Sequence, residues 1–182
     1  MQLGDAGSKY LYLLGFGSNL GDKTHNCRQG LLLLSQFGNL LQATKWELTQ
    51  PLTSAWYSTD DHGEYLNFVC LYSSPLDPWE LYSEIESIEN QVGHNRKSKW
   101  LPRQLDIDIL MCTYQTHSYF ENCIPFLVHA PSQNGLCIPH KDFWNRPFWW
   151  QPILNELKIP MKALNLHFGH NENHLNFEAF AP

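Results

Sequence analysis

The segment Leu105–Leu110 alternates apolar and acidic residues, with Asp106 and Asp108 on one side of the pattern and aliphatic residues on the other. A period of two residues is typical of a β-strand, because successive side chains of a strand point to opposite faces. The segment therefore predicts a strand that buries one face and presents two carboxylates on the other. Such a strand requires a sheet that is covered on at least one side.

A helix with clear boundaries precedes this strand. Asp77 can cap it, Pro78 suits its first helical position, Glu80 can close a capping box, and Gly93 can end it. Apolar residues recur at helical spacing between these ends, namely Leu81, Ile85, Ile88 and Val92.

An earlier helix is predicted after Asp22, which can cap it. Its apolar positions repeat at helical spacing, at Cys27, Leu31 and Leu34. Gly38 offers the left-handed residue with which many helices end.

The remaining strands are predicted from apolar and aromatic runs. Tyr10–Leu14 reads as a buried strand that stops at a glycine-bearing turn, Gly15–Gly21. Leu40–Leu48 is a weaker strand candidate, and Tyr65–Tyr72 is a stronger one. The aperiodic segment Gln50–Glu64 between them predicts a loop long enough to carry function.

The order strand, helix, strand, strand, helix, strand predicts a ferredoxin-like α+β fold, an antiparallel sheet with both helices packed on one face. The other face is then expected to be free for a site. The segment from Pro147 onward shows little periodicity and forms a C-terminal extension. A length of 182 residues suits one domain, 1–182.

Charge and apolar runs limit the partners and the location. A formal net charge of −6 argues against general binding to nucleic acid or to an anionic membrane. The start Met1–Lys9 lacks a secretion signal, and the aliphatic run Leu31–Leu34 is too short to cross a bilayer. We therefore expect a cytoplasmic protein. The 5 cysteines are scattered without a Cys-x-x-Cys pair, which favours free thiols over disulfides or a zinc site.

Asp106 and Asp108 form a candidate metal site. Their backbones on one strand face lie about 6.6 Å apart, so the carboxylates can converge on a hard cation such as Mg²⁺. A plain amphipathic strand with its acidic face in water is the alternative. Basic residues precede the strand at positions 96, 97, 99 and 103. They suit either a polyphosphate ligand or a solvated basic loop.

Four segments, in order, resemble the motifs of the 6-hydroxymethyl-7,8-dihydropterin pyrophosphokinase family. They are Gly17–Asp22, Tyr65–Asn67, Pro102–Leu110 and Ile138–His140. The pattern P-R-x-L-D-x-D-I-L in the third segment is highly specific, and the likeness extends from about residue 10 to about residue 156. The sequence is thereby identified as a somewhat divergent member, with His94 where the family usually has arginine.

The resemblance implies transfer of the β,γ-pyrophosphate of ATP to the hydroxymethyl oxygen of the reduced pterin, in folate biosynthesis. It implies that Asp106 and Asp108 hold two Mg²⁺ ions and that Arg103 and Arg96 assist catalysis. The ATP-binding residues that it implies are Glu89, Lys97, Arg103, Ile109, His140 and Arg146. The pterin-binding residues that it implies are Thr49, Leu52, Tyr65, Asn67, Trp100 and Phe148.

Two other functions stay open from the sequence. One is a catalytically weakened relative that still binds pterin or nucleotide. The other is a ferredoxin-like RNA-binding module, although Asp106 and Asp108 on its sheet face would repel phosphates. For the pyrophosphokinase we expect small-molecule substrates, no nucleic-acid or membrane partner, and a monomer.

Overall fold

The computed structural model describes residues 10–51, 63–93, 102–114, 124–125, 127–128 and 136–168. Its elements, in chain order, are β1 (Tyr10–Ser18), α1 (Lys23–Leu34), β2 (Asn39–Ala43), β3 (Glu47–Thr49), β4 (Tyr65–Ser74), α2 (Pro78–Val92), β5 (Asp106–Tyr114), β6 (Ile124–Pro125), α3 (Pro147–Asn155) and α4 (Met161–Phe168).

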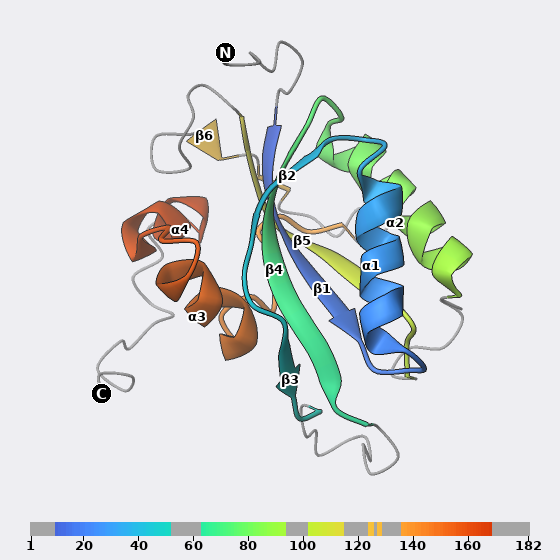
Figure 1. Ribbon diagram of the computed structural model, residues 1–182. Coiled ribbons are helices and arrows are strands. Elements are labelled where there is room, and N and C mark those ends of the chain that lie inside the picture. Colours follow the sequence, from blue (N-terminus) through green and yellow to red (C-terminus); the bar gives the residue numbers. More distant parts are fainter. Residues whose placement is uncertain are drawn as a thin grey trace, which may run out of the picture.

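These strands form one antiparallel sheet in the order β2-β4-β1-β5-β6, with β3 also paired to β4. Helices α1 and α2 lie together on one side of the sheet, and α3 and α4 lie on the other (Figure 1). Strand β1 lies between β4 and β5 and pairs with both, although neither follows it directly in the sequence. This arrangement confirms the ferredoxin-like α+β fold.

Helix α2 has both predicted ends. The Asp77 side chain accepts hydrogen bonds from the backbone N–H groups of Trp79 at 2.8 Å and Glu80 at 3.0 Å. The Glu80 carboxylate in turn accepts one from the Asp77 N–H at 3.0 Å, which completes the capping box. Gly93 ends the helix with φ of 119°, a left-handed conformation that favours glycine.

Helix α1 begins as predicted and ends earlier. The Asp22 side chain accepts from the His25 N–H at 2.9 Å. The helix stops at Leu34, so the prediction that Gly38 ends it was wrong. A Cβ at Gly38 would lie 2.1 Å from the Ser73 carbonyl oxygen. Glycine is therefore needed there for close approach to β4.

Two strand predictions were also wrong in their limits. Strand β1 does not stop at Gly15 but continues to Ser18, because this stretch pairs with both β4 and β5. The Leu40–Leu48 candidate is two strands, β2 and β3, separated by residues 44–46. Thr44 still contacts β4, since its N–H donates to the Val69 carbonyl at 2.9 Å, but its side chain, in place of a backbone carbonyl, accepts from the Val69 N–H at 2.9 Å.

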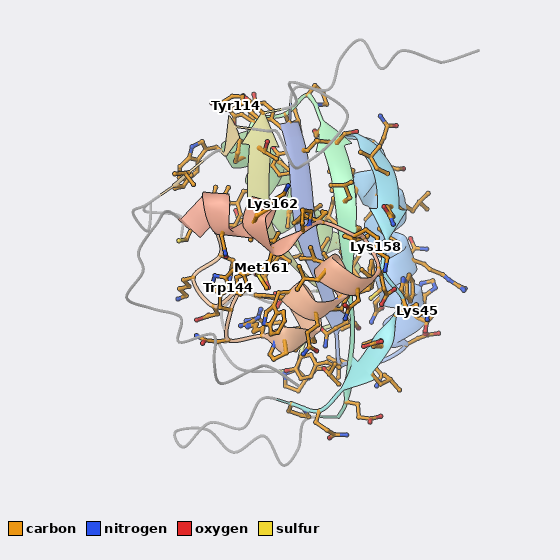
Figure 2. The ribbon with its side chains drawn as sticks, turned by 90° about the vertical axis from the view of Figure 1, so that its left-hand side faces the viewer. Lys45, Tyr114, Trp144, Lys158, Met161 and Lys162 are labelled. Carbon is orange, nitrogen blue, oxygen red and sulfur yellow. The ribbon has the colours of Figure 1, made fainter. Side chains whose placement is uncertain are left out.

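Two apolar cores lie on opposite faces of the sheet. Residues of β1 alternate between them: Tyr12, Leu14 and Phe16 pack under α1 and α2, whereas Leu11 and Leu13 pack under α3 and α4. Figure 2 shows α3 and α4 lying across the strands. The expectation of a free second face was therefore wrong for much of its length, because the C-terminal extension carries enough apolar surface to cover it. The same face holds Asp106 and Asp108, beyond the second core.

The cysteines of the described segments are free thiols, as predicted. Cys27, Cys70 and Cys112 are buried and Cys137 is half-buried. Burial raises the pKa of Cys27 to about 12, so this thiol stays protonated at neutral pH. Within the described segments no helix is both long and apolar enough to cross a bilayer.

The capping box of α2 predicts a measurable stability difference. We expect Asp77→Ala to lower the free energy of unfolding by about 1–2 kcal/mol, because two backbone donors lose their acceptor. Ser83→Ala, at an exposed position in the same helix, is the control and should cost less than about 0.5 kcal/mol. Equal losses in urea unfolding would contradict the role of the cap.

Candidate active site

The register of β1 with β5 places a glycine opposite each aspartate of the acidic pair. Gly17 pairs with Asp106 and Gly15 pairs with Asp108. Directly opposed residues of an antiparallel pair share a face. Each carboxylate therefore lies beside a position without a side chain. Both side chains stay partly exposed, 29% for Asp106 and 28% for Asp108.

Three predicted pterin residues, Thr49, Tyr65 and Asn67, lie on the same face as the acidic pair. Gly17 pairs with Asn67 on its other side, so Asn67, Gly17 and Asp106 form a row across β4, β1 and β5. Two strand spacings separate the ends of this row by about 10 Å. The Asn67 amide donates to the Thr49 hydroxyl at 2.7 Å. Tyr65 shares this face two residues before Asn67.

Tyr65 lies within electrostatic range of charged groups around the acidic pair. Burial raises the pKa of its phenol, Arg103 and Arg146 oppose that rise, and Asp106 adds to it. These groups come from two separate parts of the chain, the segment 103–106 and the start of α3.

Asp106 is paired with Arg103, whose guanidinium forms an ion pair with its carboxylate. The backbone of Arg103 is held as well: its N–H donates to the Asn19 side chain at 2.6 Å, and its carbonyl accepts from the N–H groups of Asn19 at 3.0 Å and Leu20 at 3.1 Å. The segment after β1 thus holds the backbone of Arg103 in place by hydrogen bonds. Sequence reasoning missed this role of Asn19.

Asp108 has looser partners. His140 Nε2 and Arg146 Nη1 each lie 3.7 Å from its carboxylate oxygens, beyond direct hydrogen-bond distance. Desolvation and the neighbouring Asp106 raise the pKa of Asp108 above its ordinary value, and Arg146 only partly opposes this. The carboxylate is therefore incompletely neutralised, and a bound cation would stabilise its charged form.

The tautomer of His140 follows from its contacts. Its Nδ1 accepts from the Asp142 N–H at 3.2 Å, so in the neutral ring Nε2 carries the proton and faces Asp108. Its backbone N–H donates to the Leu110 carbonyl at 2.9 Å, which fixes it to β5. Burial and the nearby Arg146 lower the pKa of His140 to about 4, so the ring is neutral at pH 7.

Arg146 and Phe148 stand at the start of α3. Arg146 is the N-cap residue of this helix, and its guanidinium also lies 3.9 Å from the Asp142 carboxylate. Phe148 is half-buried, with its ring centroid 5.6 Å from that of Trp149. The start of α3 therefore brings a cation to within 3.7 Å of the Asp108 carboxylate.

Glu89 and Ile109, two predicted ATP-binding residues, lie on the helix side of β5. Glu89 is 1% exposed, and its carboxylate accepts from the Ile107 N–H at 2.7 Å, between the two aspartates. The Ile109 side chain is buried in the core under α1 and α2. Ile109 can therefore offer only backbone groups to a ligand, and the ATP contacts of both residues stay predictions.

The acidic pair fits Mg²⁺ by its donor set. In the described segments no group of three or more His, Cys, Asp and Glu side chains could hold a metal ion. Two carboxylates remain, one of them with a raised pKa. Mg²⁺ is commonly held by one or two carboxylates, with water and substrate phosphates completing its shell.

The structure brings together most of the predicted site residues that it describes. Asp106, Asp108, Arg103, His140 and Arg146 surround one end of β5. Four predicted site residues lie outside the described segments, namely Leu52, Arg96, Lys97 and Trp100. Gly15 and Gly17 were noticed in the sequence only as a turn. A spacing of two residues that matches the two aspartates was their only signal.

Comparisons with known proteins agree with this geometry. A family model described as 7,8-dihydro-6-hydroxymethylpterin-pyrophosphokinase (HPPK) matches residues 13–158. A 2-amino-4-hydroxy-6-hydroxymethyldihydropteridine pyrophosphokinase of Aquifex aeolicus is 35% identical over 142 residues, covering 78% of this chain and 76% of its own. The Bacillus subtilis protein of that name is 33% identical over 145 residues, covering 77% and 74%.

A solved structure supports the fold. A chain from the crystal structure of HPPK-DHPS in complex with substrates superposes with a TM-score of 0.53 at 14% sequence identity. The superposition covers 94% of this chain and 45% of that chain, so the likeness concerns less than half of the larger protein. Together with the family model and the relatives from Aquifex and Bacillus, the fold leads to one conclusion: the chain belongs to the 7,8-dihydro-6-hydroxymethylpterin-pyrophosphokinase family.

Proposed function

We propose that this protein transfers pyrophosphate from ATP to 6-hydroxymethyl-7,8-dihydropterin, giving AMP and the pterin diphosphate in folate biosynthesis. Family membership supports the reaction. The observation that carries its assignment to one site is the row Asn67, Gly17, Asp106 on a single sheet face. The Asn67 amide, proposed to bind pterin, and the Asp106 carboxylate, proposed to act near the phosphates, then lie roughly 10 Å apart, about the length of a small ligand.

The pterin half of the site consists of Asn67, Thr49, Tyr65 and Phe148. Because the Asn67 amide already donates to the Thr49 hydroxyl, its orientation is fixed before ligand arrives. Its carbonyl oxygen and remaining N–H can pair with the rim of a flat heterocycle. The rings of Tyr65 and Phe148 can flank the face of that heterocycle.

The phosphate half consists of the acidic pair and its cations. The hydroxymethyl oxygen attacks the β-phosphorus and loses its proton to solvent, the bond from that phosphorus to the α,β-bridging oxygen breaks, and AMP leaves with the electron pair. Arg103 and Arg146 can neutralise phosphate oxygens, and neutral His140 can donate its Nε2–H. Such transfers depend on alignment and charge neutralisation more than on covalent catalysis.

Asp106 and Asp108 would hold the two Mg²⁺ ions. When bound, Mg²⁺ neutralises phosphate charge and orients the reacting oxygens. Without ligand, the Arg103 guanidinium pairs with the Asp106 carboxylate. A phosphate that binds between them can replace Asp106 as the partner of that guanidinium. Arg103 thus holds the Asp106 carboxylate in place for a metal ion before substrate binds.

Several finer assignments rest on the resemblance alone. Arg96, Lys97 and Trp100 are proposed to close over the nucleotide and exclude water, with Leu52 near the pterin. We propose that the protein is a cytoplasmic monomer with a single domain. An RNA-binding role is not favoured, since Asp106 and Asp108 on this face would repel an RNA backbone.

The acidic pair provides the first functional prediction. We expect Asp106→Asn and Asp108→Asn each to lower kcat/KM by about a thousandfold, because each loses a metal-binding carboxylate. The measurement is AMP release from ATP and Mg²⁺, with and without 6-hydroxymethyl-7,8-dihydropterin. Glu84→Gln is the control, since this carboxylate belongs to α2, on the other side of the sheet (Figure 1). A fully active Asp106→Asn protein would disprove the metal assignment.

Glu89 separates an internal role from a ligand contact. Glu89→Ala removes the acceptor of a buried N–H group on Ile107 and should cost about 1–3 kcal/mol of stability. It should also lower kcat, because Ile107 lies between the two aspartates. Glu89→Gln keeps an acceptor oxygen and should retain most activity. If Glu89→Gln instead raised the KM for ATP with unchanged stability, the ligand contact would be the better account.

His140 predicts a pH dependence of stability. The ordinary histidine pKa is 6.5 and the folded value is about 4, so between these values the unfolded chain binds a proton that the folded chain does not. Stability is therefore lost as the pH falls from 6.5 to 4, by about 2–3 kcal/mol for this group. Urea unfolding of the metal-free wild type and of His140→Asn should show that the difference in their free energies of unfolding becomes smaller as the pH falls. A difference that is constant from pH 7 to 4.5 would contradict the buried neutral ring.

A further inference from the structure

Trp149 is the shared contact of two side chains that face Asp108. It is 2% exposed and lies in the first turn of α3. The Arg146 guanidinium carbon lies 4.3 Å from the centroid of its indole ring, a cation–π distance. The His140 ring meets the indole edge to face, with centroids 5.0 Å apart and planes at 85°.

Neither Arg146 nor His140 is held firmly by Asp108 itself. Each lies 3.7 Å from that carboxylate, and the other ion pair of Arg146, with Asp142, spans 3.9 Å. Long ion pairs at partly exposed positions restrict a side chain little. A buried rigid indole in contact with both side chains restricts them more.

The indole has room because residue 15 is glycine. A Cβ on Gly15 would lie 2.8 Å from Trp149 Nε1 and 3.2 Å from its Cε2. Gly15 is an ordinary strand residue, since the positive-φ glycines of the described chain are Gly21 and Gly93. Its backbone would therefore accept alanine, and the need for glycine is steric. Gly15 also pairs with Asp108, which places the indole beside the metal-binding position.

We infer that Trp149, packed against Gly15, is a positioning residue that holds Arg146 and His140 in place beside Asp108 for the phosphates of ATP. The kinetic part of this inference rests on the proposed function. A merely structural Trp149 would fill the second core and affect stability alone. A positioning Trp149 also determines how well two preset side chains meet the phosphates.

Four proteins test the packing contact between Trp149 and Gly15: wild type, Gly15→Ala, Trp149→Leu and the double variant. In wild type the new methyl group displaces the indole, so Gly15→Ala should lower the free energy of unfolding. With leucine at 149 the clash with the indole is absent and only the 3.2 Å contact with the Leu110 side chain remains, so the same change should cost clearly less stability. If the two substitutions changed the free energy of unfolding additively, the packing contact between Gly15 and Trp149 would be contradicted.

Ile153→Ala is the matched control for the positioning role. Ile153 is fully buried in the same core, one helical turn further along α3. We expect Trp149→Leu and Gly15→Ala to raise the KM for ATP or lower kcat by about tenfold, the scale of a lost cation–π contact and its preorganisation. The KM for pterin should change less than about twofold. If Ile153→Ala gave the same kinetic pattern, Trp149 would be a core residue only.

A readout independent of activity separates this inference from the proposed function. The Arg146 δ-protons should show an upfield ring-current shift in NMR spectra of wild type that disappears in Trp149→Leu. Mg²⁺–α,β-methylene-ATP should bind about tenfold more weakly to that variant. If wild type released no pterin-dependent AMP, the proposed function would fail while these readouts still decided the positioning role. If Trp149→Leu did not fold, Gly15→Ala would carry the same comparison, and unchanged Arg146 shifts in that variant would overturn the inference.

Discussion

The antiparallel register of β1 with β5 is the constraint on which the site depends. It sets Asp106 opposite Gly17 and Asp108 opposite Gly15, so both carboxylates share a face with Asn67 across the sheet. A slip of one residue would turn both carboxylates into the core under α1 and α2 and turn Ile107 outward. The apolar period of β5 therefore specifies the chemistry as well as the packing.

Contacts from three directions reinforce that register. Glu89 of α2 accepts from the Ile107 N–H on the helix side, and the segment after β1 clamps the backbone of Arg103 just before the strand begins. On the other face α3 presents Arg146, with Trp149 packed against Gly15. The C-terminal extension thus closes a second core and supplies part of the site.

The sequence predicted features whose cause is local. The capping box of α2 and the period-two pattern of β5 involve neighbours in the chain, and both were confirmed. The errors involved distant partners. Gly15 and Gly38 were interpreted as breaks in the chain, whereas one makes room for Trp149 and the other for Ser73. The acidic pair could be proposed from its spacing. The basic side chains beside it, Arg103 before β5 and Arg146 at the start of α3, belong to segments without periodicity, so their placement did not follow from a pattern.

We propose that one sheet face holds both substrates, with the pterin at Asn67 and the ATP phosphates at Asp106 and Asp108. A crystal structure with Mg²⁺, α,β-methylene-ATP and 6-hydroxymethylpterin would show where each ligand binds. We expect metal ions coordinated by both aspartates, phosphates between Arg103 and Arg146, and the pterin ring paired with Asn67. Metal or nucleotide bound away from β5, with Asp106 and Asp108 free of ligand, would contradict it.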